Sequence, residues 1–555
     1  MLFRIAEDEG EVRLQQLCYA FYPLEESLMK KTNRILSLAL ALIMVMGCIV
    51  LPAGAVGSDG KWIATWGTAP VDFYISLADY IPNFAVNGKV SPGTLLRTEL
   101  TVSTAGEKLR FKFSNEYGDR DVTVASVFVA KTDTSESGAV LTDTEAALRF
   151  GGSKKLVIPA GETVWSDEVD IKTAALERLT VSMYITEETP IKTVGLFCGK
   201  TYFSRAVRGN EDLGHMVNPS EVSIATGGNA YHIIPFLTAI DSYTESEAAY
   251  SAAFIGDSTL VNGVTGYISG RLVDAGRDDI GVINAGIMGN RLFYKGTGLI
   301  GNLYGDPVMD RFTRDALDIT GCDRIIVKIG VNDILHPSSK SMGNDAPYVS
   351  AQEIIDGYKK LTDIAHENGK KIFFMEITPW NGYVRDILGN KNDIIWKEEL
   401  QEMCDEVNEW IKTNDIADGY IDSDSLSQPK NPTAFIKHFT KDGIHFTEMG
   451  ALAFADCIDV EQVFGVSGAR TASEILGIDP YSETKQTKKN ERLVKFRNVL
   501  LMVRQLLSTM RVEFGPLQKL LNKLIDSLPD GRELSANVRK NIANGARKLS
   551  AAARR

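Results

Sequence analysis

Four apolar runs in the middle of the chain each end in a short turn rich in Gly, Asn, Asp or Ser. This repeated pairing constrains the fold more than any other feature. The turns cover residues 256–258, 284–289, 330–333 and 442–445. Between and after the runs, helical periodicity predicts helices over 264–275, 351–368, 394–414 and 448–457. Alternating strands and helices indicate an α/β domain in which a parallel sheet lies between two layers of helices, a three-layer α/β/α arrangement.

The first turn places a serine just past the end of a buried strand. Residues 251–255 form the apolar run, and Ser258 follows Gly256 by two positions. Open α/β sheets place their sites at the carboxyl edge of the strands, where such a hydroxyl is accessible. A serine becomes a strong nucleophile only when a neighbouring base takes its proton. The alternative is that Ser258 only caps the next helix.

The fourth turn supplies a base and an acid. Asp442 and His445 lie three residues apart on one loop. A carboxylate in this position can orient one nitrogen of the imidazole while the other nitrogen faces a nucleophile. His438 is the nearest rival base. The alternative for His445 is a surface histidine without a catalytic role.

The two middle turns supply hydrogen-bond donors. Gly286 and Gly289 follow the run that ends at Asn284, and glycine lets backbone N–H groups approach a ligand closely. Asn332 follows the run 324–329, and its side-chain amide can donate to a developing oxyanion. Each turn by itself would be ordinary, but their order at successive strand ends predicts a hydrolytic site.

These motifs resemble those of the GDSL/SGNH esterase superfamily between about residues 251 and 464. The matching stretches are Gly-Asp-Ser, Asn-Ala-Gly-Ile-x-Gly-Asn-Arg, Gly-x-Asn-Asp and Asp-x-x-His. The resemblance implies that Ser258 is the nucleophile, His445 the general base and Asp442 its partner. It also implies an oxyanion hole built from the N–H groups of Ser258 and Gly289 and the side chain of Asn332.

Other positions refine the resemblance. The stretches 311–315 and 377–380 are similar to a secreted bacterial branch with a β-rich domain ahead of the catalytic one. Thr259 stands where the family usually has Leu or Ile, and this position is expected to pack rather than react. The family chemistry implies an ester hydrolase with no metal or organic cofactor. A short acyl group on carbohydrate is the favoured substrate. A lipase or lysophospholipase, or a carbohydrate-binding surface protein with a vestigial hydrolase domain, are the alternatives.

Ahead of the hydrolase-like segment, expected over 250–465, residues 60–243 alternate apolar and polar side chains in short stretches. Examples are 96–102, 109–113 and 179–185. Many short strands separated by turn signals predict an all-β sandwich or jelly roll. Its aromatic residues either stack on sugar rings or belong to the core, and the sequence leaves both readings open. They include Trp62, Trp66, Tyr74 and Tyr80.

The two ends of the chain have different compositions. Residues 1–55 are interpreted as an extension followed by a signal peptide, because basic residues precede an apolar run over 35–51 and a small-residue cleavage site. Residues 1–28 are read as an extension ahead of a start at Met29. A membrane anchor is the alternative, but the run is short for a spanning helix. A lipoprotein signal at Cys48 ranks below ordinary cleavage. The chain is therefore expected to be secreted or held at a bacterial cell surface.

The tail, residues 486–555, has 16 Lys and Arg residues against 5 Asp and Glu, a net charge of +11. Its helical periodicity predicts a basic helical tail that either contacts anionic wall polymers or membrane surfaces or packs as a small bundle. The whole chain of 555 residues carries a net charge of −12, which argues against a nucleic-acid-binding body. This length requires at least two domains.

Overall fold

The structure is a computed structural model. It describes residues 60–76, 85–134, 138–203, 231–261, 263–298, 300–339, 346–383 and 395–482. The predicted signal segment 1–55 and the basic tail 486–555 lie outside the described residues. All described residues belong to one compact unit that begins at Gly60. Within this described part, every helix is too short or too polar to cross a membrane.

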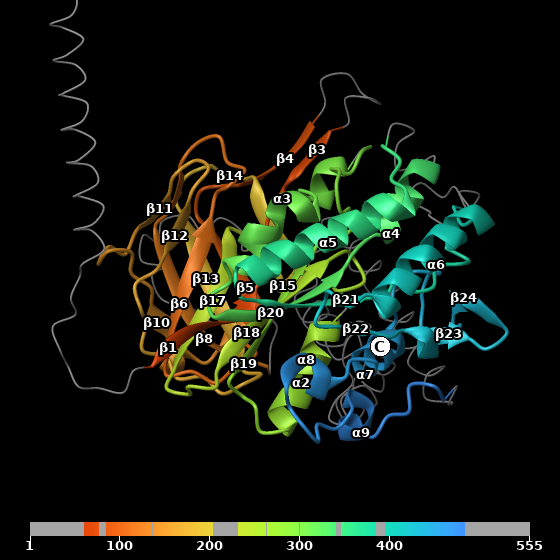
Figure 1. Ribbon diagram of the computed structural model, residues 1–555. Coiled ribbons are helices and arrows are strands. Elements are labelled where there is room, and N and C mark those ends of the chain that lie inside the picture. Colours follow the sequence, from red (N-terminus) through yellow and green to blue (C-terminus); the bar gives the residue numbers. More distant parts are fainter. Residues whose placement is uncertain are drawn as a thin grey trace, which may run out of the picture. The chain divides into compact units, whose positions relative to one another are not determined.

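The apolar runs form a parallel sheet of five strands in the order β19-β18-β20-β21-β22 (Figure 1). The strands are β18 (Tyr250–Gly256), β19 (Ile280–Gly286), β20 (Cys322–Lys328), β21 (Lys371–Met375) and β22 (Gly419–Ile421). Most of their side chains are buried, because helices cover the sheet and both faces must be apolar. The expected α/β domain is confirmed.

Among the described residues, the four longest helices coincide with the predicted helical stretches. They are α2 (Val264–Asp274), α5 (Ala351–Glu367), α6 (Glu398–Thr413) and α7 (Glu448–Asp456). Helix α5 begins at a capping box in which Ser350 and Glu353 satisfy each other's backbone N–H groups. Helix α6 begins later than the predicted position 394, after Lys397, which adopts an extended conformation.

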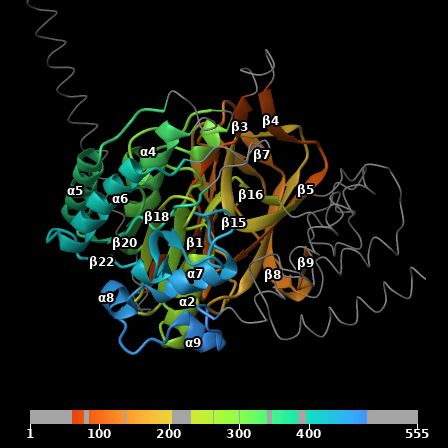
Figure 2. The same cartoon turned by 90° about the vertical axis from the view of Figure 1, so that its right-hand side faces the viewer.

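Helices pack against the sheet from both sides. In β18, Phe254 and Ile255 are neighbours and therefore point to opposite faces. Ile255 shares a hydrophobic cluster with Leu361 of α5. Phe254 shares a second cluster with Ile268 of α2 and Phe454 of α7. Figure 2 shows the arrangement from the side. The short helices are α3 (Val308–Phe312), α4 (Val331–Leu335), α8 (Val460–Phe464) and α9 (Ala472–Leu476).

The region before the parallel sheet is built of antiparallel strands. Two of its sheets have the orders β1-β17-β6-β12 and β10-β8-β13-β5-β15-β16. The strands of these two sheets are β1 (Lys61–Gly67), β5 (Thr94–Thr101), β6 (Lys108–Ser114), β8 (Ser126–Asp133), β10 (Ala146–Ala147), β12 (Thr163–Trp165), β13 (Arg178–Ile185), β15 (Thr193–Phe203), β16 (Tyr231–Pro235) and β17 (Leu237–Thr244). The shorter strands are β2 (Val71–Asp72), β3 (Tyr74–Ser76), β4 (Ala85–Val90), β7 (Val122–Val124), β9 (Ala139–Val140), β11 (Leu156–Ile158) and β14 (Thr189–Ile191).

The aromatic residues of this β-rich part differ in their surroundings. Trp66 is buried, and its indole N–H donates to the carbonyl oxygen of Cys198 at 3.1 Å, so it belongs to the core. Trp62 is half-buried and lies under the guanidinium of Arg110. Tyr80 lies outside the described residues. The core reading therefore holds for Trp66.

The β-rich part and the parallel sheet share one hydrophobic cluster, which contains Val71 of β2 as well as Ile255 of β18. Strand β1 is joined to the sheet by hydrogen bonds. The Ala64 N–H donates to the carbonyl oxygen of Thr320 at 2.9 Å, and the Ser251 hydroxyl donates to the Ala64 carbonyl at 3.1 Å. A Cβ at Gly281 would lie 1.9 Å from the same Ala64 oxygen, so only glycine fits there. The β-rich part is therefore packed directly on the sheet.

Candidate active site

The register of the parallel strands brings the first three turns together. Gly256 at the end of β18 pairs with Gly286 of β19 on one side and with Lys328 of β20 on the other. Backbone hydrogen bonds continue past these ends: Ile287 N–H donates to Gly256 O at 3.0 Å, and Asp257 N–H donates to Lys328 O at 3.1 Å. The carboxyl edge of the sheet therefore carries residues from three separate stretches of sequence.

Ser258 lies in a turn directly after β18 and is 8% exposed. Asp257 fixes this turn, because its Oδ1 accepts hydrogen bonds from the N–H of Thr259 at 2.9 Å and from its hydroxyl at 2.7 Å. The next helix, α2, has Gly263 as its N-cap and no side-chain capping bond. The alternative in which Ser258 caps this helix is therefore wrong. Thr259 does more than pack, since its hydroxyl binds the Asp257 carboxylate.

A chain of hydrogen bonds joins Ser258, His445 and Asp442. Ser258 Oγ lies 3.0 Å from His445 Nε2, and His445 Nδ1 lies 2.6 Å from Asp442 Oδ2. The other carboxylate oxygen, Asp442 Oδ1, accepts the N–H groups of Ile444 at 3.1 Å and His445 at 2.9 Å. In this arrangement the imidazole has one nitrogen on the carboxylate and the other on the serine hydroxyl.

The loop that carries Asp442 and His445 is held mainly by its own residues. The Thr440 hydroxyl donates to the His445 carbonyl at 3.0 Å and accepts the Gly443 N–H at 2.9 Å. Gly443 has φ of 104°, and a Cβ there would lie 2.4 Å from the Tyr383 nitrogen, so the turn requires glycine. The Tyr383 ring meets the His445 ring edge-on, with 6.0 Å between their centroids.

The charge of Asp442 suits this geometry. Burial by itself would raise the pKa of the carboxyl, but the hydrogen bonds from the side chain and backbone of His445 lower it below its usual value. The carboxylate is therefore ionised at neutral pH and can hold a proton on Nδ1. The rival base His438 is engaged elsewhere, since its Nε2 lies 2.7 Å from the carbonyl oxygen of Pro480.

The two turns that supply hydrogen-bond donors, residues 284–289 and 330–333, are called the donor turns, and they meet at Asn290. Asn332, near the start of α4, is 4% exposed, and its Nδ2 donates to the carbonyl oxygen of Asn290 at 2.9 Å. A side-chain amide carries two hydrogens, so Asn332 retains a second one for a ligand. Gly289 precedes Asn290 and has φ of 67°. A Cβ at Gly289 would lie 2.2 Å from the ring of Tyr304, so no other residue fits. The structure therefore brings Asn332 next to the loop of Gly289.

A buried ion pair ties the same two turns together. Arg291 Nε lies 3.6 Å from Asp333 Oδ1, and both side chains are fully buried. Asp333 Oδ2 also accepts the Leu292 N–H at 2.8 Å. Burial raises the pKa of Asp333 to about 6, although the charge of Arg291 opposes the shift. Sequence reasoning missed this pair. Its signal is that each charged residue directly follows an asparagine of a donor turn.

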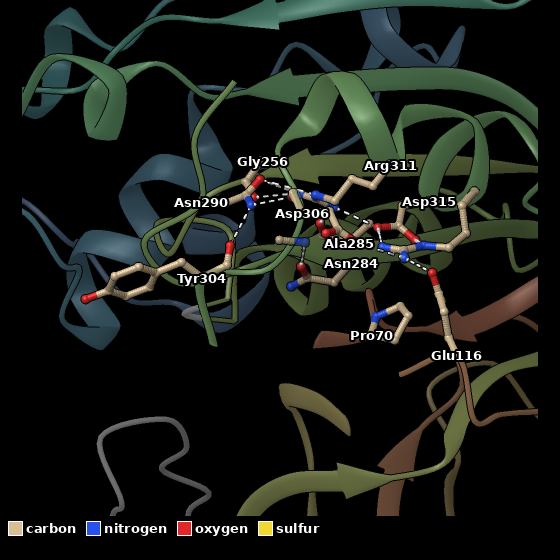
Figure 3. Close-up of polar contacts among 12 residues, drawn as sticks. Pro70, Glu116, Gly256, Asn284, Ala285, Asn290, Tyr304, Asp306, Arg311 and Asp315 are labelled. Carbon is tan, nitrogen blue, oxygen red and sulfur yellow. Dashed lines mark hydrogen bonds and ion pairs between the residues drawn. The ribbon is translucent and has the colours of Figure 1, made fainter. Parts of the chain in front are cut away.

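A second buried arginine contacts both the nucleophile strand and the donor loop (Figure 3). Arg311 of α3 is 1% exposed and donates to the carbonyl oxygens of Gly256 at 3.0 Å and Ala285 at 2.8 Å. It also donates to Asn290 Oδ1 at 2.9 Å and pairs with Asp315 at 3.0 Å. The stretch 311–315 stands out in the sequence for its similarity to a branch of the family, but no role is predicted for Arg311.

The β-rich part contributes to this region through the loop after β6. Glu116 pairs with Arg314, whose guanidinium also binds both oxygens of Asp315 at 2.7 and 2.8 Å. The hydroxyl of the adjacent Tyr117 donates to Asp306 Oδ2 at 2.6 Å. The β-rich part thus contacts Arg314, which binds the same carboxylate that neutralises the charge of Arg311.

A group of three carboxylates lies elsewhere in the described part. Glu376, Asp422 and Asp424 have oxygens within 4.8 Å of one another. Lys412 Nζ already lies 2.9 Å from Glu376 and 3.0 Å from Asp424, so an ammonium group supplies the cation that this group attracts. None of these residues contacts Ser258 or His445 in the hydrogen bonds described above.

Comparison with known proteins gives a family match over this segment. The model of the GDSL-like lipase/acylhydrolase family matches residues 223–458. Among solved structures, a variant of an acetyl xylan esterase from Geobacillus stearothermophilus is 17% identical, with a TM-score of 0.30, over 40% of this chain and 97% of its own. A GDSL-like lipase from Bacteroides thetaiotaomicron is 16% identical, with a TM-score of 0.25, over 36% of this chain and 80% of its own. No curated protein matches.

Proposed function

We propose that Ser258, His445 and Asp442 carry out the reaction of this chain, a GDSL-type ester hydrolase by the family match over residues 223–458. The observation that carries the proposal is the continuous hydrogen-bond chain through these three side chains, with separations of 3.0 and 2.6 Å. The half-buried, ionised carboxylate of Asp442 fixes the tautomer of His445 that leaves Nε2 free to accept a proton.

In the proposed mechanism, Ser258 Oγ attacks the carbonyl carbon of the ester while His445 Nε2 takes the hydroxyl proton. The carbonyl oxygen becomes an oxyanion that accepts hydrogen bonds from the N–H groups of Ser258 and Gly289 and from Asn332. His445 then gives its proton to the leaving alcohol, and an acyl-enzyme forms. Water, activated by His445, releases the acid and restores Ser258. The residues present supply every proton transfer in these steps.

We propose that the substrate is a short acyl ester, such as an acetyl ester, on carbohydrate. Two exposed tyrosines near the donor turns support this choice. The Tyr294 ring lies over the guanidinium of Arg291, and Arg291 Nη2 donates to the carbonyl oxygen of Pro347 at 2.6 Å. Tyr348, the next residue, is 73% exposed. These exposed rings are connected through Arg291 to Asp333 of the second donor turn, and exposed aromatic rings suit the apolar face of a sugar ring.

The two ends of the sequence support a proposal for the location of the enzyme. We propose that residues 1–55 direct export and that the tail 486–555 contacts anionic polymers of the cell surface. We also propose that residues 60–243 act as a sandwich or jelly-roll accessory domain that forms one wall of the site, because Glu116 and Tyr117 contact Arg314 and Asp306 in the segment between the two donor turns. A lipase or lysophospholipase is the second candidate. A vestigial hydrolase is disfavoured by the contact between Ser258 and His445.

The test is the turnover of p-nitrophenyl acetate by the full chain and by Ser258→Ala. Loss of the nucleophile should lower kcat about 10³-fold or more. Ser269→Ala is a matched control, because this buried serine of α2 donates to the Thr265 carbonyl at 3.0 Å and lies away from His445. An unchanged kcat for Ser258→Ala would exclude the proposed nucleophile.

The substrate is tested separately with acetylated xylan and with a long-chain ester. A carbohydrate acylesterase should release acetate from the polysaccharide and turn over p-nitrophenyl acetate faster than p-nitrophenyl palmitate. Faster hydrolysis of the palmitate would favour the lipase alternative. In both cases Ser258→Ala should be inactive, so the acyl preference and the catalytic assignment are judged independently.

A further inference from the structure

Arg311 contacts two of the segments that form the candidate site, strand β18 and the stretch from β19 to Asn290, and its side chain is almost completely buried. Its Nη2 donates to Gly256 O, which lies two residues before Ser258. Its Nη1 donates to Ala285 O in β19. Its Nε and Nη2 both donate to Asn290 Oδ1, at 3.2 and 2.9 Å (Figure 3). One guanidinium therefore joins the strand of the nucleophile to the loop that follows Gly289.

Asn290 connects these two segments to a third one, the turn that carries Asn332. Its side-chain oxygen accepts Arg311, and its carbonyl oxygen accepts Asn332 Nδ2 at 2.9 Å. Its side-chain nitrogen donates to the carbonyl oxygens of Tyr304 at 2.7 Å and Asp306 at 2.8 Å. Every polar atom of the Asn290 side chain is therefore engaged, and the residue has little freedom to move. The direction of the Asn332 amide depends on it.

We infer that Arg311 is a positioning residue for ester hydrolysis: it fixes the relative placement of the Ser258 turn and the donors Gly289 and Asn332 without touching substrate. This inference rests on the proposed function. The guanidinium suits the role because it is planar, permanently charged and able to donate in several fixed directions. Its buried charge is neutralised by Asp315, and Glu116 of the β-rich part holds Arg314 against the same carboxylate.

The inference predicts a specific kinetic effect. The oxyanion is present only along the reaction path, so misplaced donors should slow kcat and leave KM little changed. A lysine at position 311 keeps the charge but cannot span the three acceptors that the guanidinium reaches. Arg311→Lys should therefore lower kcat for p-nitrophenyl acetate about 10²-fold, the size expected for a displacement of about 1 Å.

Arg271→Lys is the matched control. Arg271 is also a buried arginine bound to backbone carbonyls, with donors 2.9 Å from Arg470 O, 2.6 Å from Ala455 O and 2.8 Å from Ile458 O. It lies in α2 and contacts none of the donor turns in these bonds. Its substitution should lower the thermal stability and leave kcat of the folded protein unchanged. Equal loss of kcat in both variants would mean that Arg311 is merely structural.

A double-mutant cycle with Asn332→Ala separates positioning from stability. If Arg311 acts through the donors, adding Arg311→Lys to Asn332→Ala should lower kcat by clearly less than Arg311→Lys does alone, because one of the donors that Arg311 positions is already absent. If the kcat losses of the two single variants simply multiply in the double variant, the inference is overturned.

If circular dichroism shows that Arg311→Lys does not fold, Asn290→Ala replaces it, because this substitution removes the side-chain oxygen that accepts Arg311. Asn290→Ala should lower kcat about as much as expected for Arg311→Lys, and its loss should likewise shrink when Asn332→Ala is already present. A kcat equal to that of the wild-type protein would overturn the inference.

The two proposals fail in different ways. Activity that survives Ser258→Ala contradicts the proposed function. An inactive Ser258→Ala together with a fully active, folded Arg311→Lys contradicts only the role of Arg311. Both comparisons use the full chain and the same soluble ester.

Discussion

The two halves of the candidate site are built in different ways. The acid–base loop is partly exposed, with 34% of the His445 side chain and 36% of the Asp442 side chain accessible, and hydrogen bonds among residues 440–446 define its shape. The donor turns are buried, and contacts between distant parts of the sequence hold them: Arg291 and Asp333 join one turn to the other, Arg311 comes from α3, and all three are almost completely inaccessible. One half is encoded locally, whereas the other depends on long-range packing.

This difference has a physical cause. The imidazole must move a proton to and from groups that change during the reaction, so its loop needs access to substrate and water. Donors for an oxyanion act best when they are fixed in advance and sheltered from water. Substitutions in the acid–base loop should therefore affect chemistry directly, whereas the donor half should respond to residues that never meet the substrate.

The largest effect is expected in the local half. His445→Ala should lower kcat about 10³-fold or more, because it removes the ring nitrogen that lies 3.0 Å from Ser258 Oγ and takes its proton. His438→Ala is the control, since this ring binds the Pro480 carbonyl and should be dispensable for turnover. Initial rates on p-nitrophenyl acetate measure both. An inactive His438→Ala beside an active His445→Ala would mean that the wrong base has been chosen.

A somewhat smaller effect is expected in the buried half. Asn332→Ala should lower kcat about 10²- to 10³-fold with little change in KM, because the oxyanion exists mainly in the transition state. Asn414→Ala is a suitable control, as its amide caps α6 by donating to the carbonyl oxygens of Trp410 and Ile411. Steady-state kinetics distinguish the outcomes. A raised KM at normal kcat would make Asn332 a substrate-binding residue.

The smallest effect concerns stability at acid pH. The pKa of Asp442 is lower in the folded protein than its usual value, so its ionised form stabilises the fold. This contribution is fully present above the unfolded pKa, about 3.9, and is lost as pH falls through the lower folded value. Asp442→Asn lacks it and should also lose less activity than His445→Ala.

Thermal unfolding between pH 6 and pH 3 measures this difference. The Tm of the wild-type protein should exceed that of Asp442→Asn most clearly at pH 6, and the gap should narrow toward pH 3. A gap that stays constant over this range would mean that the carboxylate of Asp442 gains no stability from His445.

The positions of the candidate site residues in both halves could be predicted from sequence. Strand ends of a parallel sheet meet at one edge, so apolar runs followed by Ser258, Gly289 and Asn332 were enough to place these residues in one region. The spacing of Asp442 and His445 is itself a turn motif. The spacing has limits, however, because Asp-x-x-His also occurs at Asp212 and His215, outside the described residues. The 3.0 Å separation from Ser258 singles out His445 among the described residues.

The long-range contacts that hold the donor turns could not be predicted in the same way. Nothing in the spacing of Arg311 shows that its side chain runs inward to Gly256 and Asn290, because that depends on how α3 packs beneath the sheet edge. The partner of Arg314 is also remote, since Glu116 lies 198 residues earlier in the chain. Trp66 illustrates the converse: the sequence left a sugar-binding role and a core position both open, and packing made Trp66 part of the core.

The seam between β1 and the parallel sheet has a consequence for how the chain is made. The Ala64 carbonyl receives its hydrogen bond from Ser251, 187 residues later, and the Ala64 N–H needs the carbonyl of Thr320. A nascent chain therefore carries β1 with unsatisfied backbone groups until the first strands of the parallel sheet have been synthesised. Such late closure is slow in folding and leaves strand edges exposed meanwhile. Strand β1 is synthesised early, but its contact with the parallel sheet can form only after Ser251 and Thr320 have been synthesised.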